Sequence, residues 1–272
     1  MNPFWFVAIF AGYFLGFAFY FIHFEFQKNT LALWAKKVTV LTLLSHLAFL
    51  GILVLEKHLF IIASLSEYLY VLSFLIALIS FYTESRYRTR HLMLFSLPIV
   101  LLLCFLAILL TEKNSAVQAS TDPWWLWLHI GLIFTGLASI AVSVSSAVMY
   151  LLQSAQLKSK HLGKIFLALP SIDALDRLHF RSLIWGVILF SLGILSGLFW
   201  AGVVQESKDV FKDPQVILSF LVCATYWVVL SLRLSALRRG QKIAYSTVLI
   251  FSVLCIALVT SYYCPAGIHK GF

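Results

Sequence analysis

Eight long apolar runs restrict this chain more than any other feature of its sequence. They cover about residues 4–24, 38–55, 61–82, 92–111, 125–152, 181–204, 214–236 and 243–263. A helix needs about 20 apolar residues to cross the hydrocarbon core of a bilayer. Only 11% of the residues are charged, against about 25% in soluble domains. The sequence therefore predicts an all-α integral membrane protein, a bundle of about eight transmembrane helices.

The connections between the runs are short. None is long enough to form a separate soluble domain, so we expect a single polytopic membrane domain over residues 1–272. Within it we distinguish an N-terminal four-helix part, residues 1–121, from a second part, residues 122–272. The start of the chain, MNPFWFVAIF, lacks the positive region that opens a signal peptide, so we expect the mature protein to keep it.

The basic residues alternate between the two sides of the predicted bundle. The first, third, fifth and seventh connections hold 15 of the 20 Lys and Arg residues. Because positively charged loops stay in the cytoplasm, this pattern predicts that the N- and C-termini both face the outer side. The net charge of +9 then reflects topology and a lipid environment, and we expect no nucleic-acid partner.

The stretch DPWWLWLHIG, residues 122–131, concentrates aromatic side chains beside one histidine. Trp124, Trp125 and Trp127 precede His129 within six residues. Tryptophans gather where a membrane helix meets water, and they also form walls around flat ligands such as haem. The predicted topology places this stretch on the outer side, together with Trp200.

His129 and His269 are the sharpest candidates for chemistry. A neutral imidazole nitrogen is a good ligand for haem iron, and two of them on opposite faces of a porphyrin make the iron six-coordinate. The predicted topology puts both histidines on the outer face, where the tryptophans could supply apolar walls. On the residues alone, an aromatic belt at the membrane surface remains the alternative.

His46 lies near the middle of the second apolar run, in LLSHLAFLG. Ionisable groups at that depth are costly and are often functional. The residue could ligate a second, buried haem, or it could pack as a neutral imidazole that bonds a neighbouring Ser or Thr, which we favour. The four cysteines are scattered without a CxxC or CxxCH pair, so they predict no metal framework and no covalently attached haem.

Small residues recur along one face of the fifth and sixth runs. Such residues let helix backbones approach closely in lipid, so they predict tight packing of these two helices. They are Ser139, Ser143 and Ala147 in the fifth run and Gly186, Gly193, Gly197 and Ala201 in the sixth. Before the sixth run, Pro170 should break any helix and Ser171 should cap a short surface helix that leads directly into it.

Two segments carry a resemblance to a known family. WLHIGLIFTGLASIAVSVSSAVMYLL and LPSIDALDRLHFRSLIWGVILFSLGILSGLFWA resemble the cytochrome c assembly protein family, the CcsA, CcmC and HemX-like group, and lie closest to the HemX-like branch. The resemblance runs from about residue 122 to the end. It implies haem handling in cytochrome c maturation or near haem synthesis. It also implies a place in the bacterial inner membrane and assembly or haem-synthesis proteins as partners.

The resemblance also assigns residues. His129 and His269 match the two outer haem histidines of the CcsA type, and Trp200 matches the first tryptophan of the family's tryptophan-rich WWD segment. The chain departs from the pattern in the following loop, WAGVVQESKDVFKDPQ, which keeps the Asp-Pro but loses the intervening tryptophans. Ser231 stands where the family has a further histidine.

These observations favour a haem-binding or haem-handling membrane protein of cytochrome c biogenesis or haem homeostasis. We predict haem b near the outer face, held by His129 and His269 and walled by the four tryptophans. No catalytic constellation is recognisable, so we expect no catalysis of its own. The alternatives are a non-catalytic membrane subunit of a larger assembly, with or without haem, and a small-molecule transporter. The only residue that favours a transporter is His46.

Overall fold

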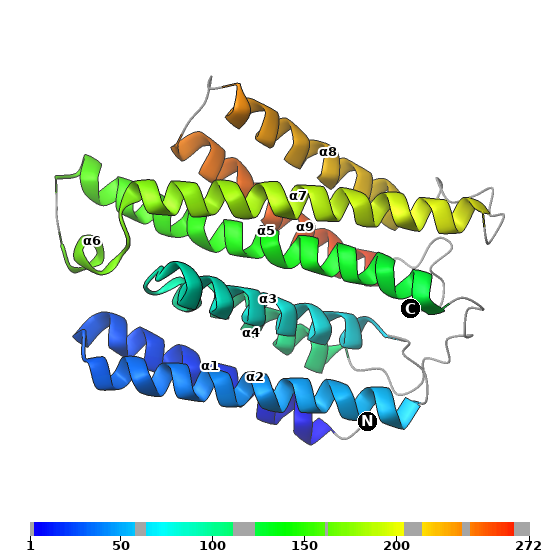
Figure 1. Ribbon diagram of the computed structural model, residues 1–272, viewed down its shortest axis with the longest axis horizontal. Coiled ribbons are helices and arrows are strands. Elements are labelled where there is room, and N and C mark those ends of the chain that lie inside the picture. The colour runs from blue at the N-terminus through cyan, green and yellow to red at the C-terminus, as the bar shows by residue number, and fades with distance from the viewer. Residues whose placement is uncertain are drawn as a thin grey trace. The chain divides into compact units, whose positions relative to one another are not determined.

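The computed structural model describes residues 3–57, 64–110, 123–160, 163–203, 214–235 and 240–263. Throughout these residues the regular structure is helical (Figure 1). The helices are α1 (Pro3–Phe26), α2 (Asn29–Lys57), α3 (Leu65–Tyr87), α4 (Leu92–Leu109), α5 (Pro123–Lys158), α6 (Lys164–Ala168), α7 (Ile172–Val203), α8 (Pro214–Leu234) and α9 (Gln241–Tyr263).

The predicted fold class, an all-α integral membrane protein, is confirmed. Seven described helices, α1 to α5, α7 and α8, are long and apolar enough to cross a membrane. The eighth long helix is α9, whose described apolar stretch, Gln241–Ile256, is shorter. Each helix satisfies its own backbone hydrogen bonds, which is why apolar runs of this length fold as helices in lipid.

The chain divides into two compact units, and each is described by itself. The first comprises residues 1–114 and 152–174. Its helices pack in a closed order, α1 on α2, α2 on α3, α3 on α4 and α4 on α1. The contact between α1 and α2 depends on Gly12 and Gly16, because an added Cβ would lie 2.5 Å from Thr42 Oγ1 and 3.1 Å from Thr39 Oγ1, respectively. Gly12 and Gly16 thus form a GxxxG-type packing face.

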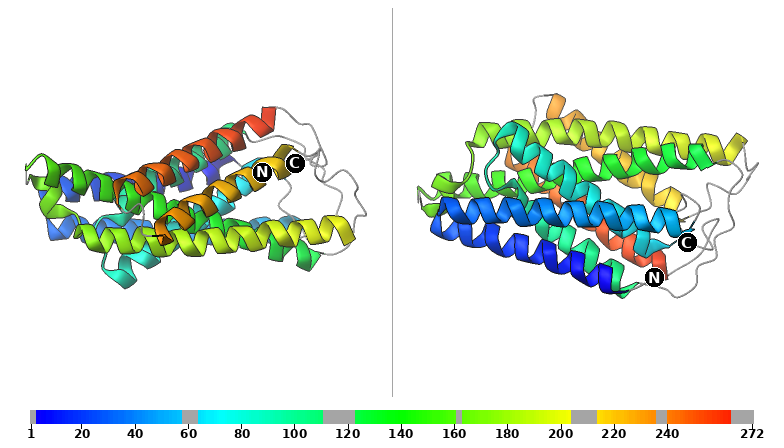
Figure 2. Two further views of the ribbon diagram at one scale, coloured as in Figure 1. Left: turned by 90° about the horizontal axis from the view of Figure 1, so that it is seen from above. Right: turned by 60° about the horizontal axis from the view of Figure 1, so that its bottom comes forward.

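The second unit comprises residues 115–151 and 175–272. Here α5 and α7 run side by side (Figure 1), and α8 packs on α9 (Figure 2). Several polar contacts connect α7 to this pair, among them Trp227 Nε1 of α8, which donates to Ser191 Oγ of α7 at 2.9 Å. Asp176 forms an ion pair with Arg233 of α8, and His179 Nε2 lies 3.1 Å from Thr247 Oγ1 of α9.

One helix start differs from the sequence-based expectation, and one agrees with it. α2 begins at Asn29 rather than near residue 38, because residues 29–37 are rich in the helix formers Leu, Ala and Lys. The surface helix predicted after Pro170 leads directly into the sixth apolar run as expected, since α7 runs unbroken from Ile172 to Val203. Ser171 caps it as predicted, with its Oγ accepting a hydrogen bond from the Ala174 amide at 3.4 Å.

The orientation of the termini stays a prediction from the basic residues. A reporter fused after Phe272 should be active on the outer side, and one inserted beside Lys160 should be active in the cytoplasm. The measurement is the paired activity of a cytoplasm-dependent and an exterior-dependent reporter at each position. The opposite result would place the charge-rich connections outside and would contradict the assignment of His129 to the outer face.

Candidate functional site

The candidate site begins with the seam between α5 and α7. The predicted tight packing of these helices is confirmed, because glycines on each helix lie against the other. A Cβ added to Gly193 would lie 2.7 Å from the Ile133 side chain, and one added to Gly186 would lie 2.6 Å from Ile140 Cγ1. The contacts recur at helical spacing, so one face of α5 is held against one face of α7 along the second unit.

His129 lies in this seam near the Trp-rich end of α5. Its Nδ1 lies 2.8 Å from the carbonyl oxygen of Gly193. A carbonyl oxygen can only accept, so Nδ1 carries the hydrogen, and the lone pair of this tautomer is on Nε2. Ser196 Oγ donates to the same carbonyl at 2.7 Å and lies 3.4 Å from Nδ1. These contacts set both the tautomer and the direction of the imidazole.

Gly197 provides the space that the His129 ring occupies. An added Cβ on Gly197 would lie 2.6 Å from His129 Cε1 and 2.8 Å from Nδ1. Any other residue at this position would therefore push the imidazole out of its place. The glycine spacing along α7 thus serves the histidine as well as helix packing.

We expect Gly197→Ala to disturb the histidine while leaving the fold intact. The added methyl group meets the end of a side chain that can swing, rather than a backbone. The displaced ring would lose its hydrogen bond to Gly193, and the loss of such an orienting partner weakens ligation by about 10- to 100-fold. The measurement is haem affinity beside thermal unfolding. Wild-type affinity would show that the orientation of His129 is irrelevant to haem.

The predicted aromatic walls are placed only in part. Trp125 lies one turn before His129 on α5, and its Nε1 donates to the carbonyl oxygen of Ser196 at 3.0 Å. It packs against Phe199 at 5.2 Å between ring centroids and against Trp124 at 4.9 Å. Trp125 is therefore part of the same α5–α7 seam as His129, whereas Trp124 is exposed.

The two remaining tryptophans stand on different helices. Trp200 lies three residues beyond Gly197 on α7, about one turn of helix. Its Nε1 is buried, and no described residue accepts a hydrogen bond from it. Trp127 lies on α5 and is partly buried. His269 lies outside the described residues, so the second member of the predicted ligand pair stays a prediction.

His46 lies in the first unit and is fully buried. Its Nδ1 is 3.1 Å from the Tyr13 hydroxyl, and the rings of Tyr70 and Phe74 stand 5.2 Å from its own. The bonding partner is thus a tyrosine of α1, not the Ser or Thr expected from the sequence. His46 Nε2 is buried, and no described residue bonds it.

The packing interpretation of His46 leads to a direct test. We expect His46→Ala to leave the haem content per protein unchanged and to lower the free energy of unfolding by about 2–5 kcal/mol, because it empties a closely packed aromatic site. Haem content is measured by pyridine haemochrome absorbance, and stability by thermal unfolding in detergent. A loss of part of the haem would instead favour a second, buried haem at His46.

Ser231 of α8 stands where the family has a further histidine, and it does not take over the chemical role of that histidine. Its Oγ donates to the carbonyl oxygen of Trp227 in its own helix at 2.8 Å. The three cysteines in the described residues, Cys104, Cys223 and Cys255, are free thiols. Cys264 lies outside the described residues.

The fold and the seam define a multi-pass helical membrane protein with an oriented histidine at one helix end. The model of the family "Cytochrome C assembly protein" matches residues 60–269. The chain belongs to the cytochrome c assembly protein family. The match starts well before residue 122, where the sequence motifs begin, and so includes α3 and α4.

Individual relatives agree with this family. The chain is 24% identical over 283 residues to "Cytochrome c biogenesis protein CcsA" of Prochlorococcus marinus subsp. pastoris, covering 93% of this chain and 90% of that protein. It is 30% identical over 141 residues to "Protein HemX" of Brevibacillus brevis, covering 52% of each. "Protein HemX" of Bacillus subtilis is 28% identical over 145 residues, covering 53% of this chain and 52% of that protein. No solved structure matches.

Proposed function

We propose that this protein binds haem b at the Trp-rich end of α5 and handles it in cytochrome c biogenesis or haem homeostasis. His129 and His269 are the two axial ligands in this proposal. The observation that carries it is the orientation of His129, whose Nδ1 donates to the Gly193 carbonyl oxygen at 2.8 Å. An imidazole that bonds backbone through one nitrogen and has its lone pair on the other is the form that ligates iron.

The surroundings of His129 fit a flat apolar ligand. Trp125 and Phe199 supply aromatic surface beside the histidine, and the buried Nε1 of Trp200 is a donor that a haem propionate could use. Bound haem would supply an iron that can be held by two imidazoles. The protein's own part is to orient the imidazole and to cover the porphyrin edge with apolar surface.

The family supports the second ligand and the biological setting. The matched region extends through residue 269 and so includes both histidines. We infer a place in the bacterial inner membrane, with cytochrome c assembly or haem-synthesis proteins as partners. Co-purification with either group of proteins would separate a role in cytochrome assembly from one in haem homeostasis.

The first experiment is a reduced-minus-oxidised absorption spectrum of the purified wild-type protein. Bis-imidazole ligation predicts sharp visible bands of low-spin, six-coordinate haem on reduction. A haem-free preparation that also fails to take up added haem would contradict the proposal and favour a haem-free subunit of a larger assembly.

A further inference from the structure

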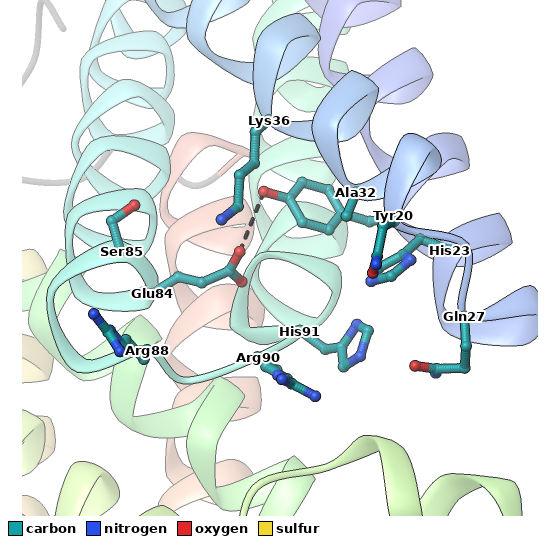
Figure 3. Close-up of a pocket in the computed structure, with 11 residues that line it drawn as sticks. Tyr20, His23, Gln27, Ala32, Lys36, Glu84, Ser85, Arg88, Arg90 and His91 are labelled. Atoms are coloured by element: carbon teal, nitrogen blue, oxygen red, sulfur yellow. Dashed lines mark hydrogen bonds between the residues drawn. The ribbon is translucent and has the colours of Figure 1, made fainter.

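A cavity of about 450 Å³ opens at one end of the first unit (Figure 3). It lies where the turn between α1 and α2 meets the turn between α3 and α4. Its lining consists of Tyr20, His23, Gln27, Asn29, Ala32, Lys36, Glu84, Ser85, Arg88, Arg90 and His91. A cavity of this size is in the range of small-molecule sites, and every lining residue except Ala32 carries a polar or charged group.

Three cations from two helical hairpins converge on this cavity. Lys36 comes from α2, whereas Arg88 and Arg90 come from the turn before α4. All three side chains are exposed, and Figure 3 shows Lys36, Arg88 and Arg90 on different sides of Glu84. Neither arginine forms an ion pair with a described residue. The cavity therefore presents positive charge on its open side.

Glu84 is the one acidic group among the described residues of the lining, and its carboxylate is occupied. One oxygen accepts from the Tyr20 hydroxyl at 3.3 Å, and the other accepts from the Met93 amide at 2.8 Å. Lys36 interacts electrostatically with this carboxylate. The positive charge of Lys36 offsets the negative charge of Glu84. The two arginines therefore give the cavity its net positive charge.

Two histidine rings, those of His23 and His91, form part of the cavity lining. The His23 and His91 rings lie 5.2 Å apart between centroids. His91 is buried, and burial, followed by the charges of His23 and Arg90, lowers its pKa to about 4. His91 is therefore neutral at neutral pH. Its side chain offers the cavity a hydrogen-bonding ring without adding to the charge.

We propose that this cavity binds a phosphate group, carried either by an anionic phospholipid or by a soluble phosphate compound. Guanidinium groups match phosphate oxygens in pairs, and a lysine adds a mobile point charge. Basic pockets between transmembrane helices are suited to lipid headgroups. The site is separate from the proposed haem site and does not depend on it, because all its residues belong to the first unit.

The test measures phosphate binding to the purified full-length chain. One arm uses phosphatidylcholine nanodiscs with a minor fraction of phosphatidylglycerol, and native mass spectrometry counts the retained phosphatidylglycerol. The other arm titrates inorganic phosphate by calorimetry. We expect Arg90→Gln and Lys36→Gln each to weaken binding by about tenfold, the effect of one charge-assisted hydrogen bond. Arg90→Lys should weaken it less, since it keeps the charge.

The neighbouring residues provide matched controls. Lys37 lies over the Trp34 ring and Arg86 lies beside the Tyr87 ring, so both are outside the cavity lining. Lys37→Gln removes a charge from the same helix as Lys36→Gln, and Arg86→Gln removes one from the end of α3, close in sequence to Arg90. Because neither residue lines the cavity, binding should stay unchanged. Helicity and thermal unfolding of each variant establish that it is folded.

Each outcome decides something. The variant pattern in the nanodisc arm alone identifies a lipid headgroup, and the same pattern in the calorimetric arm identifies a soluble phosphate; either supports the site. Equal losses in cavity and control variants would show diffuse surface electrostatics and overturn it. Absence of binding in both arms would overturn it too.

Discussion

Replacing His129 by alanine should convert the six-coordinate, low-spin haem spectrum to a five-coordinate one and should lower the haem occupancy. The reason is that one axial bond to iron is lost while the apolar surroundings still hold the porphyrin, at about 25 cal/mol per Å² of buried apolar surface. His269→Ala should give the same change, and the double substitution should abolish binding. The measurement is the absorption spectrum with haem content per protein. Added imidazole should restore the low-spin spectrum of each single variant by filling the vacated position.

The controls for this prediction are two histidines that the pattern of basic residues predicts on the cytoplasmic side. His161→Ala and His91→Ala should keep the wild-type spectrum, and His91 lies in the first unit. Should both His129→Ala and His269→Ala retain the full spectrum and occupancy, neither histidine ligates haem. The ligand assignment from the family would then not apply to this protein.

Gly136→Ala should cause the second large effect, this time on stability. An added Cβ at Gly136 would lie 2.6 Å from the backbone nitrogen and 2.9 Å from the Cα of Phe190 on α7. A backbone cannot swing aside as a side chain can, so α5 and α7 must move apart. Overpacking of this kind costs about 1–3 kcal/mol, and we expect the midpoint of thermal unfolding in detergent to fall accordingly.

Gly131 on the same helix is the matched control. No atom lies within 4 Å of a Cβ added there, and the residue is exposed. Gly131→Ala should therefore leave stability unchanged or raise it by up to about 1 kcal/mol through helix propensity. Equal stability of the two variants would mean that the α5–α7 seam does not hold these helices together.

The pair Gly136→Ala and Gly197→Ala separates the two roles of the seam. The first change meets backbone and should weaken the fold, whereas the second meets the His129 ring and should weaken haem binding with the fold intact. The glycine spacing on α7 was recognisable in the sequence as a packing face. That one of these glycines accommodates an imidazole was not recognisable, because the ring comes from another helix.

The boundaries of the helices show which features of the fold can be predicted from the local sequence. The break at Pro170 and the cap at Ser171 followed from residue type, since proline lacks an amide hydrogen and serine caps helices. The sequence also predicted that this helix leads directly into the next apolar run, and α7 is continuous from Ile172 to Val203. The partner of Asp176 in this segment was not predictable, because the ion pair joins it to Arg233 of another helix.

By itself, the sequence determined the class of this protein and the apolar runs that form its long helices. A helix needs about 20 consecutive apolar residues to cross a bilayer, so each apolar run by itself predicts a membrane helix. Only the tertiary structure decided which groups meet. His129 bonds a carbonyl 64 residues away, His46 bonds a tyrosine 33 residues away, and three cations from two hairpins share one cavity. Such contacts depend on how helices pack and rotate against one another, and in lipid that is set by small residues and polar contacts between helices rather than by the apolar pattern of any single run.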